Sequence, residues 1–271
     1  MVDPVRNVAV VTGGGSGMGQ ACAELLAERG DIVVILDRNA EKAGQVAQTI
    51  GGHGFEIDIA DHDAVEALAD RIEREVGPVT KLVNCAGIAQ TEPAPPEDLS
   101  FDVWDAVLRI NLRGTYVSCK AFGSRMAKRG GGSIVNISSM AGMRSMPLHA
   151  YGPSKAAVIN LSEGLAAEWG MSGVRVNVVA PGHVLTPMLQ ETIDNGTRDL
   201  SRLLTQYATG RVCQPVQVAR VIAFLLSDEA DSITGVTLPV DNGFLVAATW
   251  QGFGGVRPSR VTPTPAGEDA R

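Results

Sequence analysis

The sequence predicts an α/β fold in which a parallel sheet of seven strands is covered by helices on both sides, a doubly wound, three-layer arrangement. Short runs rich in Val and Ile recur along the chain and are apolar throughout, as in Ile32–Leu36. Such runs are typical of strands buried on both faces. Longer amphipathic stretches separate them. Strand–helix alternation with right-handed crossovers builds a doubly wound parallel sheet.

The elements follow one another in regular order. The expected strands are Val5–Val11, Ile32–Asp37, Gly54–Ile57, Lys81–Asn84, Ser133–Ser138, Val174–Val179 and Val236–Val240. The expected helices are Met18–Arg29, Ala40–Ile50, Asp61–Val76, Phe101–Lys128, Tyr151–Trp169 and Val216–Ser227. No repeat, linker or charge block interrupts this order. We therefore expect one domain over residues 1–250, with a polar lid at 187–213, and a Gly- and Pro-rich tail at 251–271.

Composition excludes several functional classes. The 271 residues are 45% hydrophobic and carry a net charge of −7, so a core is expected and a nucleic-acid partner is not. No apolar run approaches the roughly 20 residues of a membrane span, and the polar start, Met1–Asn7, predicts no signal peptide. Four scattered cysteines, without a C-x-x-C pair or metal-ligand spacing to histidine, predict reduced thiols in the cytoplasm and no metal site.

A glycine-rich loop follows the first expected strand. The chain reads Thr12-Gly-Gly-Gly-Ser-Gly-Met-Gly19, and the spacing is G-x-x-x-G-x-G on Gly13, Gly17 and Gly19. Glycines permit close backbone approach, and a helix N-terminus offers free N–H groups to a pyrophosphate. This loop, with Ser16 and Met18 between its glycines, is therefore predicted to bind a dinucleotide.

The second strand ends in Asp37, which lies 18 residues after Gly19. A carboxylate at that place accepts hydrogen bonds from the adenosine ribose hydroxyls and repels a 2′-phosphate. The glycine loop has no cation to offset this repulsion, although Arg38 follows directly. The sequence predicts NAD over NADP; the alternative role for Asp37 is a helix N-cap.

Tyr151 and Lys155 open a helix at i, i+4 spacing, which places both side chains on one face. A phenol is a poor base near neutral pH, and a nearby ammonium lowers its pKa. The pair is a candidate proton-transfer site.

Together these motifs resemble the short-chain dehydrogenase/reductase family over residues 5–245. The resemblance rests on the glycine loop, Asp58, the segments Asn84–Gly87 and Ile137–Ser139, Asn111, Tyr151–Lys155 and Pro181–Thr186, all in family order. It implies a Rossmann-type sheet of order 3-2-1-4-5-6-7, a nicotinamide cofactor and a homotetramer.

The resemblance also implies roles for individual residues. Tyr151 would be the general acid/base, Lys155 would bind the nicotinamide ribose, Asn111 would anchor a water, and a serine after the fifth strand would bind the substrate oxygen. The implied cofactor contacts are Gly13, Ser16, Gly17, Met18, Gly19, Asp37, Arg38, Asp58, Ile59, Asn84, Ala86, Gly87, Tyr151, Lys155, Pro181, Gly182, Val184 and Thr186.

Two positions depart from the family pattern. Cys85 stands where the family has a second Asn, which weakens one hydrogen-bonding position. The serine is ambiguous, since Ser138 has the family's 13-residue spacing to Tyr151 and Ser139 has the family's local context. A deletion in a loop is easier to accommodate than a shift on a strand, so Ser139 is preferred.

The substrate is poorly specified. Ser139 and Tyr151 are expected to meet it, with Gln90, His149 and His183 and the methionines 140, 146 and 188 as a mixed wall. We expect a secondary alcohol or ketone such as a polyol. The alternatives are a 3-oxoacyl-thioester reductase, whose acidic carrier would meet Arg125, Lys128 and Arg129, and a non-catalytic NAD-binding regulator.

Two helices carry more apolar residues than one sheet face needs. They are Phe101–Lys128, with Val103, Val107, Tyr116, Val117 and Phe122, and Tyr151–Trp169, with Val158, Leu161, Leu165 and Trp169. We expect these surfaces to pair in a tetramer.

Overall fold

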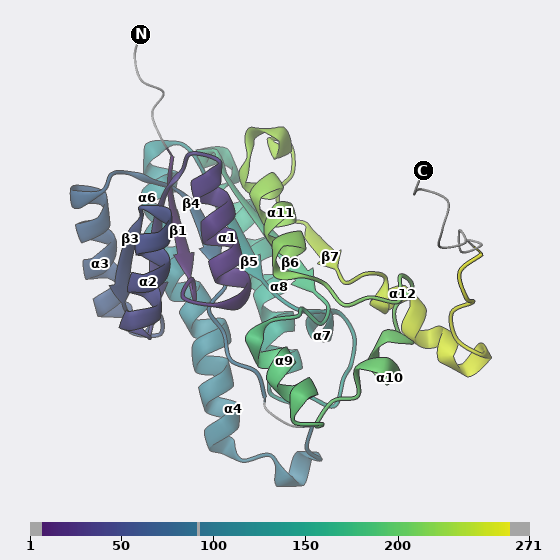
Figure 1. Cartoon of the computed structure of the whole chain (residues 1–271). Helices are drawn as coiled ribbons and strands as arrows, with labels where there is room; N and C mark the ends of the chain where they lie inside the picture. The colour runs from purple at the N-terminus through teal and green to yellow at the C-terminus, as the bar shows by residue number, and fades with distance from the viewer. Residues whose placement is uncertain (1–6, 91–92, 261–271) are drawn as a thin grey trace, which may run out of the picture.

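The centre of the molecule is a parallel sheet of seven strands in the order β3-β2-β1-β4-β5-β6-β7 (Figure 1). A computed structural model describes residues 7–90 and 93–260. The strands are β1 Val8–Thr12, β2 Ile32–Asp37, β3 His53–Glu56, β4 Val79–Asn84, β5 Gly132–Ile137, β6 Val174–Pro181 and β7 Thr237–Val240. Both the doubly wound sheet and its strand order are confirmed.

Helices cover both faces of this sheet. The main ones are α1 Gly17–Glu28, α2 Ala40–Ile50, α3 His62–Glu75, α8 Tyr151–Trp169 and α11 Pro215–Leu226. Shorter ones are α4 Phe101–Leu108, α5 Thr115–Ser118, α6 Ser124–Arg129, α7 Met140–Met143, α9 Pro187–Asp194, α10 Leu200–Leu204 and α12 Phe244–Ala247. Every predicted helix is present, with ends that differ by a few residues.

The alternation of side chains along each strand divides the core into two halves. On β1, Ala9 and Val11 pack against α1, α2 and α11, whereas Val8 and Val10 face α3, α8 and the helical segment 101–129. All four side chains are buried. This explains why the strands read as continuous apolar runs rather than alternating ones.

The segment 101–129 is one helical column with two π-helical turns, Arg109–Gly114 and Cys119–Gly123, between α4, α5 and α6. The sequence predicted a regular helix here. A π turn holds an extra residue per turn and is often found at functional sites. The first such turn contains Asn111, which is fully buried.

Some expected boundaries change. The first strand was expected from Val5, but residues 1–6 lie outside the described part, and β1 begins at Val8. The expected lid contains α9 and α10. After α12 a 3₁₀ helix, Ala248–Phe253, begins the tail, of which residues 261–271 are not described. Within the described ranges no helix has both the length and the apolarity that a bilayer crossing requires.

The apolar residues assigned to subunit contacts divide into two groups. Val107, Val117, Phe122 and Val158 are buried in the chain's own core, so they are not surface residues as the sequence suggested. Val103 and Tyr116 are exposed as expected, and Phe101 is exposed as well. Helical periodicity identified the long helices, but it did not identify which stripe of each faces the sheet.

Candidate active site

The glycine loop joins β1 to α1 at the carboxyl end of the sheet, and at Gly13 and Gly19 it leaves no room for a side chain. Gly13 has a φ of +66°, and a Cβ added there would lie 2.7 Å from the Cα of Ala86. A Cβ on Gly19 would lie 2.1 Å from the carbonyl oxygen of Gly13. The cradle is therefore bare backbone at a helix N-terminus, which Ser16 caps and Met18 continues. These features fit a pyrophosphate.

Two further segments border this loop. A Cβ on Gly17, whose φ is +57°, would lie 3.3 Å from Cγ2 of Thr186, which begins α9 as its N-cap. Thr186 belongs to the segment that leaves β6 at Pro181, passes Gly182 and pairs through Val184 with Cys213. The predicted cofactor residues 181–186 thus adjoin the glycine loop.

Asp37 ends β2 beside the same loop. Its carboxylate accepts hydrogen bonds from the backbone N–H groups of Gly15 and Asn39, each at 3.0 Å. The N-cap of α2 is Asn39, whose side chain accepts from Lys42 N–H at 2.9 Å. The alternative of Asp37 as the N-cap is therefore wrong, because its neighbour fills that place.

Asp58 follows β3 and is exposed at the edge of this region. Its carboxylate accepts from the N–H of Ala60 at 2.9 Å and from the guanidinium of Arg109 at 2.8 Å. Partial burial alone would raise the pKa of Asp58, but these hydrogen bonds outweigh it and the pKa is lowered. Arg38 adds to this lowering from β2. The next residue, Ile59, is buried against the first π turn.

The segment Asn84–Gly87 runs beneath the loop. Ala86 donates its N–H to Thr12 Oγ1 at 3.2 Å, which joins the ends of β4 and β1. The side chain of Asn84, in contrast, donates to Asn136 Oδ1 at 2.8 Å inside the core. The neighbouring strand thus holds the amide nitrogen of Asn84 in the core, while its Oδ1 is buried without a hydrogen-bond partner among the described residues.

The two candidate serines point to different partners. Ser139 caps α7, and its hydroxyl hydrogen bonds with the phenol of Tyr151 and accepts from Ala141 N–H at 3.1 Å. Ser138 donates its hydroxyl to the carbonyl of Lys155 at 2.8 Å. Ser139 therefore faces the Tyr151 phenol, whereas Ser138 links the end of β5 to α8.

Lys155 lies one turn into α8 and is buried, with 5% of its surface exposed. Its Nζ donates to the carbonyl of Ile137 at 2.9 Å and lies 5.7 Å from the centre of the Tyr151 ring. Burial lowers the pKa of Lys155 to about 8. Burial also raises the pKa of Tyr151, against the smaller opposing effect of the Ser139 hydrogen bond. The net shift is opposite to the lowering that the sequence suggested.

Asn111 connects the turn after β4 to the first turn of α8. Its Oδ1 accepts from Ile88 N–H at 2.8 Å, and its Nδ2 donates to the carbonyl of Ile88 at 2.9 Å and to Ser154 Oγ at 3.1 Å. A Cβ on Gly87 would lie 3.1 Å from Asn111 Oδ1 and 3.4 Å from Lys155 Nζ. The structure thus brings Asn111, Lys155 and Gly87 together, and Ser154 is a partner that sequence reasoning did not single out.

The expected substrate wall is uneven. Gln90 is buried and accepts from the N–H of Ala150 at 3.0 Å, and Met140 is buried as well. His149 is half-buried, whereas Met188 is 61% exposed. Gln90 therefore supports the segment that leads into Tyr151 rather than standing free as a ligand group.

His183 has the most contacts of the substrate candidates. Its Nδ1 lies 2.6 Å from the Tyr207 hydroxyl, and its Nε2 lies 3.2 Å from the guanidinium of Arg198. Its ring also packs edge-on against Phe244, with centroids 6.1 Å apart. Burial, with a smaller contribution from Arg198, lowers the pKa of His183 to about 4. Arg198 and Tyr207 were missed because residues 187–213 carry no recognisable motif.

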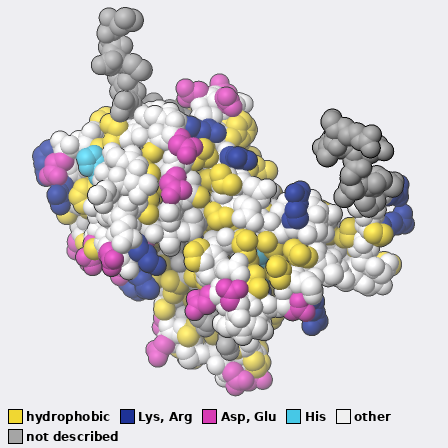
Figure 2. All heavy atoms as spheres, viewed as in Figure 1, with side chains coloured by type: hydrophobic (Ala, Val, Ile, Leu, Met, Phe, Trp, Pro, Cys, Tyr) yellow, Lys and Arg dark blue, Asp and Glu magenta, His cyan; other side chains and the backbone are white. Residues whose placement is uncertain are grey.

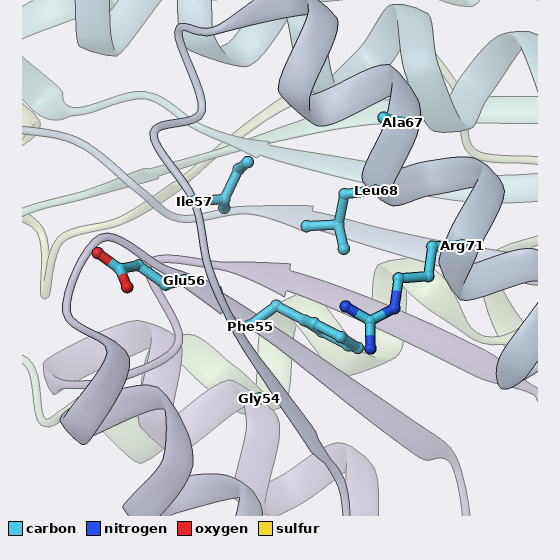
Figure 3. Close-up of a pocket in the computed structure, with 7 residues that line it drawn as sticks. All are labelled: Gly54, Phe55, Glu56, Ile57, Ala67, Leu68 and Arg71. Carbon is cyan, nitrogen blue, oxygen red and sulfur yellow. The ribbon is translucent and has the colours of Figure 1, made fainter.

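A separate hollow of about 580 Å³ opens between β3 and α3 (Figure 3). It is lined by Gly54, Phe55, Glu56, Ile57, Ala67, Leu68 and Arg71. The guanidinium of Arg71 lies 5.1 Å from the centre of the Phe55 ring. This hollow is at the outer edge of the sheet, and none of the predicted catalytic residues lines it.

Comparisons with known proteins place this geometry in context. A family model described as Enoyl-(Acyl carrier protein) reductase matches residues 13–245. D-threitol dehydrogenase of Mycolicibacterium smegmatis is 42% identical, over 88% of this chain and 93% of that protein. NAD-dependent glycerol dehydrogenase of Listeria innocua is 35% identical, over 88% of this chain and 94% of that protein.

Among solved structures, one titled ribose-5-phosphate isomerase from Brucella melitensis superposes with a TM-score of 0.91 and 48% identity. It covers 93% of this chain and 98% of that chain. Its title names a different class of reaction from the dehydrogenases, although the two folds agree over nearly their whole length.

Proposed function

Because the chain belongs to the short-chain dehydrogenase/reductase family, we propose that it transfers a hydride between NAD and a secondary hydroxyl of a polyol. It is an oxidoreductase acting on CH–OH groups. Similarity to threitol and glycerol dehydrogenases supports a polyol as the substrate. The observation that carries the proposal is the group formed by the half-buried Tyr151 with Ser139, Lys155 and Asn111, which are all buried, near the carboxyl ends of β4 and β5.

The roles of these residues follow from their contacts. With its pyrophosphate held at the glycine loop, NAD would supply the hydride acceptor for oxidation and the hydride donor for reduction. Ser139, already hydrogen bonded to Tyr151, orients the substrate hydroxyl toward the Tyr151 oxygen. Tyr151 takes the hydroxyl proton during oxidation and returns it during reduction. Lys155 places positive charge beside the phenol and favours its ionised form.

Asn111 acts on this group through the backbone. Its two bonds to Ile88 fix the turn after Gly87, and its bond to Ser154 fixes the first turn of α8. These contacts hold Lys155 and Tyr151 at a constant separation. We also propose His149 and His183 as substrate contacts, with Gln90 holding the segment before Tyr151, and the α9–α10 segment as a lid that excludes water.

NAD is the proposed cofactor, with NADP disfavoured. Support comes from Asp37, whose carboxylate sits against the backbone of the glycine loop, where the adenosine ribose is expected. A 2′-phosphate would meet this negative charge directly. Arg38 is exposed beside it and already acts on the carboxylate of Asp58.

The acyl-thioester alternative loses its main support. Arg125 pairs with Glu66 at 2.8 Å and with Asp70, and Arg129 pairs with Glu73 at 2.6 Å. With two of its three cations neutralised, this patch offers less attraction to an acidic carrier protein. The regulator alternative is disfavoured because the four reactive side chains are all in place.

Initial rates on a substrate panel test the proposal. We expect turnover with NAD on tetritols, pentitols or hexitols, and little with 3-hydroxyacyl thioesters. A higher rate with NADP than with NAD at equal concentration would contradict the cofactor assignment. Turnover confined to the thioesters would contradict the substrate class.

We further propose a homotetramer in the cytoplasm. Phe101, Tyr116 and Met171 are exposed by 81%, 48% and 101%, and Val246, Trp250 and Phe253 form a second apolar group after β7. The four cysteines are free, as a reducing compartment would keep them. Light scattering on the full chain at micromolar concentration tests the assembly, and a monomeric mass would refute it.

A further inference from the structure

Arg198 is held in an unusual way. Its guanidinium lies 3.2 Å from Nε2 of His183, and no carboxylate within the described ranges lies at ion-pair distance from it. Arg109, Arg125 and Arg129, by contrast, are each paired with an acidic side chain. Arg198 is thus fixed in place while its positive charge is not neutralised.

The protonation of His183 follows from this contact. A guanidinium only donates hydrogen bonds, so Nε2 of His183 must accept and Nδ1 must carry the proton. Nδ1 then donates to the Tyr207 oxygen at 2.6 Å, to which the His183 backbone N–H also donates at 3.1 Å. The His183 imidazole is therefore neutral and lies between the buried Tyr207 hydroxyl and the charged Arg198 guanidinium.

This group lies at the reactive end of the sheet. His183 follows β6 by two residues, and β6 pairs with β5, whose end carries Ser139. Three residues beyond His183, Thr186 borders the glycine loop. In Figure 1 the segments α7, α9, α10 and α12 gather at this end, and Figure 2 shows hydrophobic side chains gathered among them.

We propose that Arg198 binds an anionic group, a carboxylate or a phosphate, on the polyol that this enzyme oxidises. The inference rests on the proposed function and narrows its substrate class to polyhydroxy acids or polyol phosphates. Arginine binds such groups through paired, charge-assisted hydrogen bonds, which are stronger than neutral ones.

The arrangement of donors agrees with this ligand. Besides the N–H directed at His183, the planar Arg198 guanidinium has further N–H donors. It contains no acceptor atom, so every polar contact it makes is a donated hydrogen bond. A neutral polyol hydroxyl satisfies one donor, whereas a carboxylate or phosphate accepts two at once. Because His183 and Tyr207 carry no charge, neither balances the cation, whereas an anionic ligand would.

The test compares matched substrates and variants. With NAD, kcat/KM is measured for threitol, threonate and threitol 4-phosphate on the wild-type enzyme, on Arg198→Met and on Arg198→Lys. The control is Arg202→Met, which removes an exposed arginine of α10 four residues away. Threonate and the phosphate distinguish a carboxylate from a phosphate ligand.

We expect the wild type to prefer one anionic substrate over threitol by about tenfold or more. Arg198→Met should reduce that preference by about 10- to 100-fold, mainly through KM, with partial recovery in Arg198→Lys and none of the loss in Arg202→Met. Efficient use of threitol without an anionic preference would overturn the inference and leave the proposed function intact. Equal losses on threitol and on the anions in Arg198→Met would overturn it too. If the wild-type enzyme turns over none of the three substrates, both the anion-binding role of Arg198 and the proposed function are overturned.

Discussion

The two ends of the site are built differently. At the chemical end, Asn111, Ser139 and Lys155 are 0%, 8% and 5% exposed, and side chains and backbone from β4, β5, α8 and the first π turn hold them. At the nucleotide end, Asp37 is half-buried and Asp58 and Arg38 are exposed, each at the end of one strand or in one loop.

The difference bears on how each end responds to change. A buried polar side chain with several partners leaves unsatisfied groups when it is removed, and the cost is large. An exposed carboxylate exchanges a weak, screened contact for water. Substitutions at the chemical end should therefore have the larger effects on turnover and stability. Substitutions at the nucleotide end should mainly change the preference between NAD and NADP.

The largest effect is expected for Tyr151→Phe. The ring remains, so α8 should begin normally, but the proton carrier is lost. General acid–base catalysis contributes about 10²- to 10⁴-fold, and kcat should fall by that order. Fluorescence titration with NADH should show cofactor binding retained. A near-normal kcat would show that Tyr151 does not carry the proton, and the buried residues around it would lose their proposed catalytic role.

The serines provide a paired test within two adjacent residues. Ser139→Ala removes the hydroxyl beside Tyr151 and should lower kcat by about 10²- to 10³-fold. Ser138→Ala removes a buried bond to the Lys155 carbonyl and should cost about 1–3 kcal/mol of stability, with a much smaller loss of turnover. Thermal denaturation and steady-state rates on both variants decide the matter. The opposite ranking would move the catalytic role to Ser138.

The sequence predicted the chemical end better than the lid. Tyr151 and Lys155 were found from their i, i+4 spacing on one helix and Asn111 from the family resemblance, and the structure brings Asn111 and Lys155 to the same turn. Ser139 was preferred over Ser138 because a strand tolerates no shift by one residue, and in the structure the two side chains do face opposite partners.

Other features left no local signal. The π turns depend on how segment 101–129 packs against Ile59 and Trp169, which are far away in sequence. The contact between Arg198 and His183 joins two irregular segments. Asn84 appeared to be a cofactor residue from its motif, yet Asn136 on the neighbouring strand holds its amide in the core. Side-chain direction in each case depends on long-range packing.

Lys155→Met tests the chemical end through its effect on the free energy of unfolding. Burial lowers the pKa of Lys155 from an ordinary 10.5 to about 8, so below pH 8 the native state bears the cost of a buried ammonium. An apolar side chain of similar length should raise the free energy of unfolding by about 1–3 kcal/mol at pH 7, less whatever the lost bond to Ile137 costs.

The sign of the pH dependence is fixed by this shift. Below pH 8 both folded and unfolded wild-type chains are protonated, and the advantage of the variant is complete. Between pH 8 and about 10.5 the folded wild type releases its proton first, so its stability rises with pH and the advantage shrinks. Chemical denaturation at several pH values measures it. A variant advantage that grows with pH would contradict the assignment.

The smallest effect is expected for Asp37, at the nucleotide end. Its carboxylate accepts from Gly15 and Asn39 and is partly solvated, so Asp37→Ala should raise the KM for NAD by about tenfold while kcat changes little. The KM for NADP should fall, because the 2′-phosphate no longer meets a negative charge and Arg38 is adjacent. Asp37→Asn separates the causes, since it removes the charge but leaves an oxygen that accepts from Gly15. If Asn eases NADP use as well as Ala does, charge repulsion sets the preference. If only Asp37→Ala eases NADP use, the hydrogen bond that shapes the glycine loop sets the cofactor preference. The nucleotide end would then depend on fixed hydrogen bonds, as the chemical end does.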